Sequence, residues 1–448
     1  MSVFDTIDSM VPDPREWTGH VRALRGLCAV VGDLPAPVGA LVRICGQLGD
    51  VMGEVIGFDS GDAIVMAMGS REGLLSGTPV TLEQVAPVVR VGAQQLGRVI
   101  DGLARPVDGA GPIGAARVRP LQPEPIGPMH RRLIREPLHT GVRAVDLITP
   151  LGRGQRMGVF AGPGVGKSTL LGQLARGASS DINVIALIGE RGREVGEFIK
   201  ETLGPQTLAR SVVVVATGDE SPVMRVRAAK SACAIAEHFR DEGNDVLFIM
   251  DSATRFAHAQ RQIGLAVGEP PATRGYTPSV FSELACLLER AGAVDGPNGP
   301  CSITGLYTVL VEGDDMTEPV ADAARGILDG HLILSRALAQ RGYFPAIDVL
   351  DSISRVMREV ADDEHLRARQ IVLRLEARYK EIEELVRIGA YARGSDREAD
   401  AALEFREMVE ALLTQGSGES SSPGDARSAL LALASQMHAK LDSSSRAA

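Results

Sequence analysis

The sequence predicts a chain of three parts: a small β-barrel, an α/β core built on a parallel sheet, and a C-terminal helical region. Three changes in hydrophobic pattern indicate this order. Short alternating apolar segments broken by glycine occupy residues 21–95. Continuous apolar runs then alternate with helical spans from about residue 157 to residue 355. Beyond residue 363, apolar residues recur at a helical period.

The segments in residues 21–95 favour a barrel or sandwich, because alternation with period two is typical of strands with one buried face. They are Gly39–Ile44, Met52–Phe58, Ala63–Met68 and Pro79–Val85.

The segments on either side of the barrel carry weaker signals. In residues 1–20, Phe4, Ile7 and Met10 lie at helical spacing, which predicts a partner-binding segment. A frayed terminus explains the same residues equally well. Gly102–Pro128 is rich in glycine and proline and predicts a connector that lies over a surface.

Residues 96–362 form the predicted α/β domain. Runs that are apolar at consecutive positions are typical of parallel strands covered on both faces. Ligands bind such sheets at the carboxyl ends of the strands. The expected strands are Met157–Ala161, Val184–Ile188, Val212–Ala216, Val246–Met250, Thr304–Val311 and Leu332–Leu334.

Residues 363–448 form the predicted helical domain, with a serine-rich linker and tail. Its expected helices are 363–388, 395–413 and 428–441. The serine-rich stretch Gly416–Asp425 between the last two predicts a flexible linker.

Composition argues against several classes of protein. With 47 Lys and Arg against 57 Asp and Glu, the net charge of −10 disfavours nucleic acid as a partner. The five cysteines form no CxxC pair and the eight histidines no HxxxH pair, which argues against a disulfide scaffold or a zinc site. No apolar run approaches 18 residues, and the N-terminal 17 residues are acidic, so we expect a cytoplasmic protein.

The strongest motif is a glycine-rich loop between an expected strand and an expected helix. Small residues let backbone N–H groups surround a phosphate, and the following helix adds its positive end. Lys167 is expected to reach the β- and γ-phosphates of a bound nucleotide, and the Ser168 hydroxyl to ligate Mg²⁺. The expected nucleotide-binding residues here are Ala161, Gly162, Pro163, Gly164, Val165, Gly166, Lys167, Ser168 and Thr169. Ala161 replaces the first glycine of the strict pattern, a small change at a strand end.

Two carboxylates follow neighbouring expected strands. Asp251 ends the buried run Val246–Met250, as a Walker B acid does, and is expected to hold Mg²⁺ through water. Glu190 follows Val184–Ile188 and could activate the attacking water. Taken alone, Glu190 in its charged surroundings is better explained as part of a solvated cluster.

From Leu96 onward the sequence resembles the P-loop ATPases of the rotary F/V-type and type III secretion group. Several motifs are closer to the secretion branch, and Phe160–Ser168 is closest to its flagellar export members. The resemblance implies a RecA-like core that hydrolyses ATP. The motifs that carry it are Leu96–Gly102, Thr140–Asp146, Gly154–Arg156, Gly268–Pro271, Gly275–Phe281, Glu318–Asp322, Asp329–His331 and Leu334–Arg336.

The resemblance also implies roles for individual residues. It makes Glu190 the catalytic carboxylate and places Arg191 near the γ-phosphate. Phe344 stands where the family usually has a tyrosine that stacks on adenine, and its ring preserves the stacking face. Arg355 stands where the rotary α subunit supplies its arginine finger to a neighbouring subunit.

A single chain with both Glu190 and Arg355 can form six equivalent active interfaces with itself, which predicts a homohexamer. Through the resemblance we further expect a stator-like regulatory protein at the N-terminus, chaperone–substrate complexes, and an export gate at the membrane as partners. The expected location is cytoplasmic, at the periphery of the inner-membrane export apparatus.

Several alternatives remain open from the sequence. Within the group they are an injectisome secretion ATPase and a rotary catalytic subunit. A hexameric RNA translocase would need a basic, aromatic front domain, and residues 21–95 carry little of either. A nucleotide-binding scaffold without hydrolysis is the remaining alternative.

Overall fold

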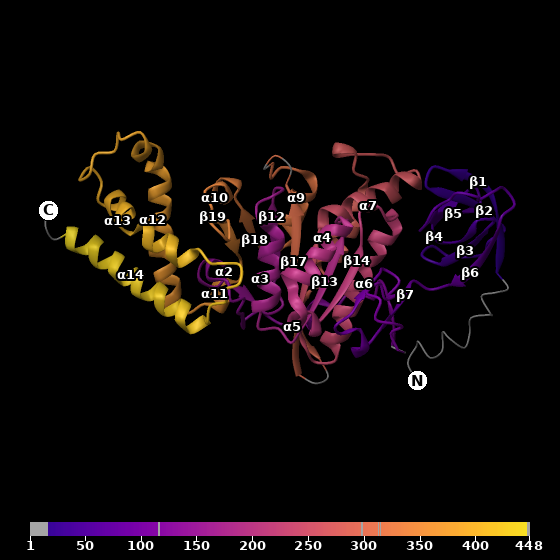
Figure 1. Cartoon of the computed structure of the whole chain (residues 1–448), viewed down its shortest axis with the longest axis horizontal. Coiled ribbons are helices and arrows are strands. Elements are labelled where there is room, and N and C mark those ends of the chain that lie inside the picture. Colours follow the sequence, from indigo (N-terminus) through magenta and orange to yellow (C-terminus); the bar gives the residue numbers. More distant parts are fainter. Residues whose placement is uncertain (1–16, 115–116, 297–298, 312, 314, 446–448) are drawn as a thin grey trace.

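A computed structural model describes residues 17–114, 117–296, 299–311, 313 and 315–445. Figure 1 shows a barrel at one end of the molecule, an α/β core in the middle and helices at the other end. The predicted fold class is therefore confirmed. Of the segment predicted to bind a partner, residues 1–16 lie outside the described residues, and Thr18 already belongs to the first strand.

The barrel in the described residues is closed, with strand order β1-β2-β5-β4-β3-β6. The four expected strands correspond to β3–β6, and the alternation has the predicted cause, since one face of each strand fills the barrel. The strands are β1 (Thr18–Arg25), β2 (Cys28–Gly32), β3 (Leu41–Gly46), β4 (Gly49–Asp59), β5 (Asp62–Ala67) and β6 (Pro79–Gln84).

The chain leaves the barrel after β6. Strand β7 (Val88–Val91) pairs with β9 (Arg117–Pro120), which lies within the predicted connector. The barrel packs on the core through a small apolar cluster that includes Ile64 and Val223. Beside it, the buried Arg227 forms an ion pair with Glu54 of β4, with an N–O distance of 3.0 Å.

The central sheet has nine strands among the residues described, and eight of them follow the order β19-β18-β12-β17-β15-β13-β14-β8. Neighbours along this path are parallel except β18 and β19, which are antiparallel. All six strands expected in this domain are present. The members are β8 (Val99–Ile100), β12 (Arg156–Ala161), β13 (Ile182–Ile188), β14 (Ser211–Ala216), β15 (Asp245–Asp251), β16 (Gly292–Gly296), β17 (Gly299–Leu310), β18 (Gly330–Leu334) and β19 (Ile347–Ser354).

Helices cover both faces of this sheet, which explains the continuous apolar runs. In β13, for example, Ile185 and Leu187 face one buried cluster and Val184 and Ala186 face the other. The first face is covered by α2 (Arg143–Ile148), α3 (Lys167–Gly177) and the turns from α4 (Gly192–Glu197) through Phe198–Leu203 to α5 (Gly204–Ala209). The second is covered by α6 (Pro222–Asp241), α7 (Ala253–Ala266), α8 (Pro278–Leu288) and α9 (Pro319–Ile327).

Short elements complete the core: β10 (Pro137–Leu138), β11 (Leu151–Gly152), α10 (Arg336–Gln340), α11 (Met357–Val360), and single turns at Ala93–Gln95, Pro128–His130 and Thr273–Gly275. Within the described part of the chain, no helix combines the length and apolar character needed to cross a bilayer.

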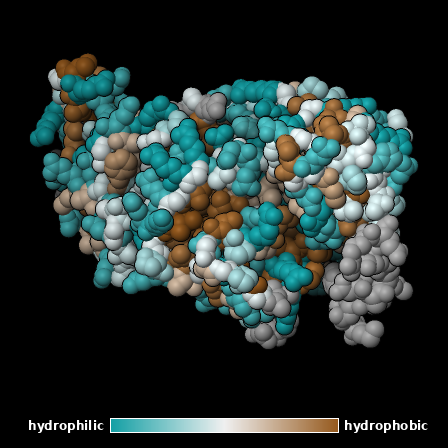
Figure 2. Space-filling view, turned by 45° about the vertical axis from the view of Figure 1, so that its right-hand side comes forward, coloured by the Kyte–Doolittle hydropathy of each residue, from teal (hydrophilic) through white to brown (hydrophobic). Residues whose placement is uncertain are grey.

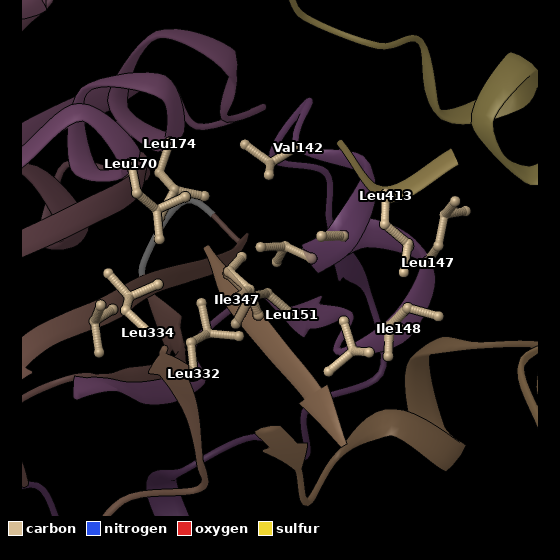
Figure 3. Close-up of a cluster of buried hydrophobic side chains, with 14 of the residues drawn as sticks. Val142, Leu147, Ile148, Leu151, Leu170, Leu174, Leu332, Leu334, Ile347 and Leu413 are labelled. Atoms are coloured by element: carbon tan, nitrogen blue, oxygen red, sulfur yellow. The ribbon is translucent and has the colours of Figure 1, made fainter. Parts of the chain in front are cut away.

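The C-terminal region consists of α12 (Asp363–Arg387), α13 (Arg397–Leu413) and α14 (Pro423–Ser445). It is continuous with the core on the side of α3. Figure 3 shows Leu413 of α13 and Leu147 of α2 in one apolar cluster, with Leu170 and Leu334 of the central domain on its other side.

The segment predicted as a flexible linker, Gly416–Asp425, is fixed to the core instead. Helix α14 begins at Pro423, five residues before its predicted start. The backbone carbonyl of Gly416 accepts a hydrogen bond from Gln173 of α3 at 2.9 Å, and that of Ser417 accepts one from Arg176 at 2.6 Å. Serine-rich composition predicts mobility, but these contacts use backbone groups that composition does not report.

Gln415 is the central polar contact of this junction, and replacing it with alanine tests its contribution. Its buried amide accepts from the Arg143 backbone N–H at 2.9 Å and donates to the carbonyls of Gly141 and Glu419 at 2.7 and 2.9 Å. Because Gln415→Ala leaves buried backbone groups unpaired, we expect a loss of about 1–3 kcal/mol in stability, measured by thermal unfolding. The control Gln436→Ala, on the exposed side of α14, should change stability by less than about 0.5 kcal/mol. Equal losses of stability in the two variants would contradict the stabilising role of Gln415.

Candidate functional site

The glycine-rich loop leaves the carboxyl end of β12 and leads directly into α3, as the sequence predicts. Gly164 and Gly166 have φ angles of +78° and +90°, a region that suits glycine and lets the backbone turn tightly. The loop therefore turns its backbone around the N-terminus of α3, where backbone N–H groups and the helix dipole favour an anion.

Three charged side chains meet beside this loop. The Lys167 ammonium forms ion pairs with Asp251, at the end of β15, and with Glu190, 3.4 Å away in the loop after β13. Strands β13 and β15 are parallel neighbours in the sheet, so both carboxylates lie at the carboxyl ends of the strands. The structure thus brings together three of the predicted catalytic residues, and all three side chains are largely buried.

The electrostatics of this cluster are those of a buried site. Burial alone would lower the pKa of Lys167, but the charges of Asp251 and Glu190 outweigh it and raise that pKa, so the ammonium stays charged. Burial raises the pKa of Glu190, and the negative charge of Asp251 raises it further against the opposing effect of Lys167. A carboxylate with a raised pKa accepts a proton more readily than an exposed one.

Backbone contacts fix the position of Glu190. The N–H of Gly189 donates to the Ala216 carbonyl at 2.6 Å, and the Glu190 carbonyl accepts from the N–H of Gly218 at 3.0 Å. Gly189 has a φ of +75°, and a Cβ there would lie 2.8 Å from the Cβ of Arg255.

Arg255 is a cation that the sequence analysis did not single out. It lies in the first turns of α7, four residues after Asp251, and its aliphatic stem packs on Gly189 next to Glu190. The sequence signal for Arg255 is its position four residues after Asp251. This position places an exposed arginine on the helix that follows the Walker B strand.

Phe344 lies against the phosphate loop, since a Cβ on Gly166 would be 3.4 Å from its ring. The ring is 45% exposed and borders a cavity of about 610 Å³. Thr169 and Gln173 of α3 line one side of this cavity, and Gly416 lines another. An exposed aromatic face beside a phosphate loop is the arrangement that base stacking requires.

The two remaining predicted arginines do not join the cluster. Arg191 is exposed and forms an ion pair with Glu194, with an N–O distance of 3.1 Å. Arg355 is exposed at the end of β19, and its guanidinium donates to the Arg325 carbonyl at 3.3 Å.

Strand direction separates Arg355 from its own phosphate loop. Ser354 pairs with Gly330, at the start of β18, whereas Ala161 pairs with Leu334, at the end of that strand. The distance along β18 is therefore roughly 13 Å, before the loop itself is counted. The backbone N–H of Arg355 also donates to the carbonyl of Asp329, whose own N–H donates to Arg156 at the beginning of β12. Arg355 thus lies at the end of the sheet where the parallel strands begin, opposite the end that carries the phosphate loop.

Ser168 and Asp251, the residues predicted to hold Mg²⁺, both offer oxygen atoms beside the phosphate loop. Ser168 lies at the start of α3, and both donors to the Asp251 carboxylate use Oδ1, which leaves Oδ2 as an acceptor among the described contacts. Within the described chain, no group of three or more His, Cys, Asp or Glu side chains could hold a metal by itself. Hydroxyl and carboxylate oxygens completed by phosphate oxygens and water are the donor set that Mg²⁺ prefers.

Known proteins match the chain over most of its length. The family described as "ATP synthase alpha/beta family, nucleotide-binding domain" matches residues 141–354, and "T3SS EscN ATPase C-terminal domain" matches residues 361–432. The "Flagellum-specific ATP synthase" of Treponema pallidum is 50% identical over 91% of this chain and 91% of its own length. The "Type 3 secretion system ATPase" of Xanthomonas euvesicatoria is 49% identical over 89% of each chain.

A solved structure extends this likeness to three dimensions. The assembled ATPase EscN from the enteropathogenic E. coli type III secretion system superposes with a TM-score of 0.87 at 42% identity. It covers 93% of this chain and 100% of that one.

Truncating Phe344 tests the stacking surface. We expect Phe344→Ala to weaken binding of a fluorescent ADP analogue roughly fivefold to tenfold, and Phe344→Tyr to bind normally, because only the ring face is needed. Phe58→Ala serves as the control, since this aromatic is 53% exposed on the barrel. Unchanged affinity in Phe344→Ala would remove the residue from the nucleotide site.

Proposed function

The chain belongs to the family of flagellum-specific ATP synthases and type 3 secretion system ATPases, and on that basis we propose that it is the ATP-hydrolysing motor subunit of the flagellar protein-export apparatus. In this role ATP hydrolysis is coupled to chaperone release and to delivery of export substrates. Membership of this family favours protein export over RNA translocation or a scaffold without hydrolysis.

One observation carries the chemistry: Lys167, Glu190 and Asp251 meet at the end of the phosphate loop. When ATP binds, Lys167 exchanges its carboxylate partners for the β- and γ-phosphates. Glu190 is then free to orient a water molecule and to accept its proton as the water attacks the γ-phosphate. Ser168, and Asp251 through water, would hold Mg²⁺, which would neutralise charge on the phosphate oxygens. Arg191 follows Glu190 directly in the chain, and the Arg255 stem packs on Gly189, so these two arginines are the proposed cations for the phosphate oxygens on this side of the site.

Arg355 acts on the site of a neighbouring copy. It lies at the far edge of its own sheet, exposed, and among the described residues no carboxylate forms an ion pair with it. Such a cation can neutralise the γ-phosphate only across a subunit boundary. The proposed assembly is a homohexamer with six equivalent sites. The related EscN structure is described as that of an assembled ATPase, which supports an oligomer.

We propose that the surface of the protein also binds other proteins. Figure 2 shows hydrophobic residues gathered toward the middle of the visible face, with smaller hydrophobic areas elsewhere on it. Exposed apolar patches often mark surfaces that bind other proteins. A related solved structure is described as EscN "in complex with its central stalk EscO", which supports a stalk-like partner here. The remaining proposed partners are a stator-like protein at residues 1–20, chaperone–substrate complexes and the export gate. The proposed location is the cytoplasmic face of the inner membrane.

The second candidate function is that of an injectisome ATPase, favoured by the 49% identity to the Xanthomonas euvesicatoria protein. The chemistry would be the same. Loss of flagellar filaments on deletion of the gene supports the first function, whereas intact filaments with lost effector secretion support the second.

Replacing Glu190 with glutamine tests the proposed reaction. A side-chain amide keeps the shape of the carboxylate but accepts no proton, so Glu190→Gln should lower ATP turnover by about 10²–10⁴-fold while binding of a fluorescent ADP analogue stays normal. Glu197→Gln, an exposed change on the following helix, should leave both quantities unchanged. Near-normal turnover in Glu190→Gln would overturn the assigned role.

A further inference from the structure

Thr308 is a buried residue of the central sheet that contacts the catalytic cluster directly. It lies on β17, between the strand that leads into the phosphate loop and the strand that ends in Asp251. Its side chain is fully buried, and its hydroxyl lies 2.7 Å from Oδ1 of Asp251. The sequence does not reveal this contact, because a threonine in a buried strand is ordinary.

The direction of this hydrogen bond is fixed by chemistry. An ionised carboxylate only accepts hydrogen bonds, so the Thr308 hydroxyl donates. Threonine is stiff at χ1, and its strand is held by parallel neighbours on both sides, so the donor keeps one position. The carboxyl group of an aspartate, in contrast, rotates over a broad range of χ2 unless a partner fixes it.

The Asp251 carboxylate has two side-chain donors among the described residues, Lys167 and Thr308, and both use Oδ1. Lys167 leaves this position when it binds phosphate. Thr308 then remains as the donor that holds the carboxylate in place.

We propose that Thr308 is a positioning residue for the magnesium site: its hydroxyl holds Oδ1 of Asp251 so that Oδ2 stays available to Mg²⁺ and its water ligands. This inference rests on the proposed ATPase function. Thr308 itself does not touch the nucleotide.

A second hydrogen bond supports a fixed relation between these strands. The backbone N–H of Leu310, two residues further along β17, donates to the hydroxyl of Thr254 at 2.9 Å. Thr254 lies in the first turn of the helix that follows Asp251. The end of β17 is thus joined to the Walker B segment at two points, Asp251 and Thr254, so Thr308 keeps a fixed position relative to the carboxylate.

The test is the magnesium dependence of three variants. Thr308→Val keeps the shape and removes the donor, while Thr308→Ser keeps the donor. Thr304→Val removes a buried hydroxyl from the middle of the same strand, four residues before Thr308, where it accepts from the Gly154 N–H at 2.8 Å. Each is titrated with MgCl₂ at fixed ATP, and affinity for a fluorescent ADP analogue is measured with Mg²⁺ and with EDTA.

For Thr308→Val we expect the Mg²⁺ concentration at half-maximal hydrolysis to rise about tenfold, because a hydrogen bond to a charged group is lost. Affinity for the ADP analogue should fall in Mg²⁺ and stay unchanged in EDTA. Thr308→Ser and Thr304→Val should keep the wild-type magnesium dependence.

An unchanged magnesium titration in Thr308→Val, or an equal change in Thr304→Val, would overturn the proposal. If Thr308→Val does not fold, Thr308→Ala compared with Thr308→Ser decides the same question. A wild-type protein that hydrolyses no ATP would instead overturn the proposed function, so the two failures are distinguishable.

Discussion

The antiparallel strand β19 is the constraint on which the rest of the site depends. The parallel strands of the core send their carboxyl ends toward the phosphate loop, while β19 runs the other way and leads to Arg355 at the opposite edge. One subunit therefore carries the phosphate loop and Glu190 on one edge and the cation on the other. The proposed ring of identical subunits requires these two ends of the sheet to meet across each subunit boundary.

The cluster of Lys167, Asp251 and Glu190 is the main electrostatic feature of the site. Two carboxylates and one ammonium lie largely out of water, and each would be costly to bury alone. Their mutual pairing offsets part of this cost. In the proposed reaction, phosphate replaces the two carboxylates as the partner of Lys167, and Glu190 is released. The proposed reaction thereby links nucleotide binding to the activation of Glu190 as the base through one ammonium group.

Much of the fold and of this cluster could be predicted from the sequence, because the signals are local. The strands of the core are continuous apolar runs, and the phosphate loop combines glycines at positive φ with a lysine at a helix start. Asp251 and Glu190 follow such runs directly. Thr308 could not be recognised in this way, since its contact with Asp251 joins residues that are far apart in the sequence. The fixed segment after Gln415 was predicted wrongly for a related reason: its contacts are made by backbone carbonyls, which the side-chain pattern does not encode.

The most direct test of shared sites combines two inactive proteins. Glu190→Gln and Arg355→Ala are each expected to lose ATP turnover, and the two chains are then co-expressed in equal amounts and purified as mixed rings. If Arg355 acts on its neighbour, about one quarter of the interfaces receive an intact glutamate and an intact arginine, and turnover returns toward that fraction of the wild-type rate. Mixed rings that stay as inactive as either variant alone would contradict this account.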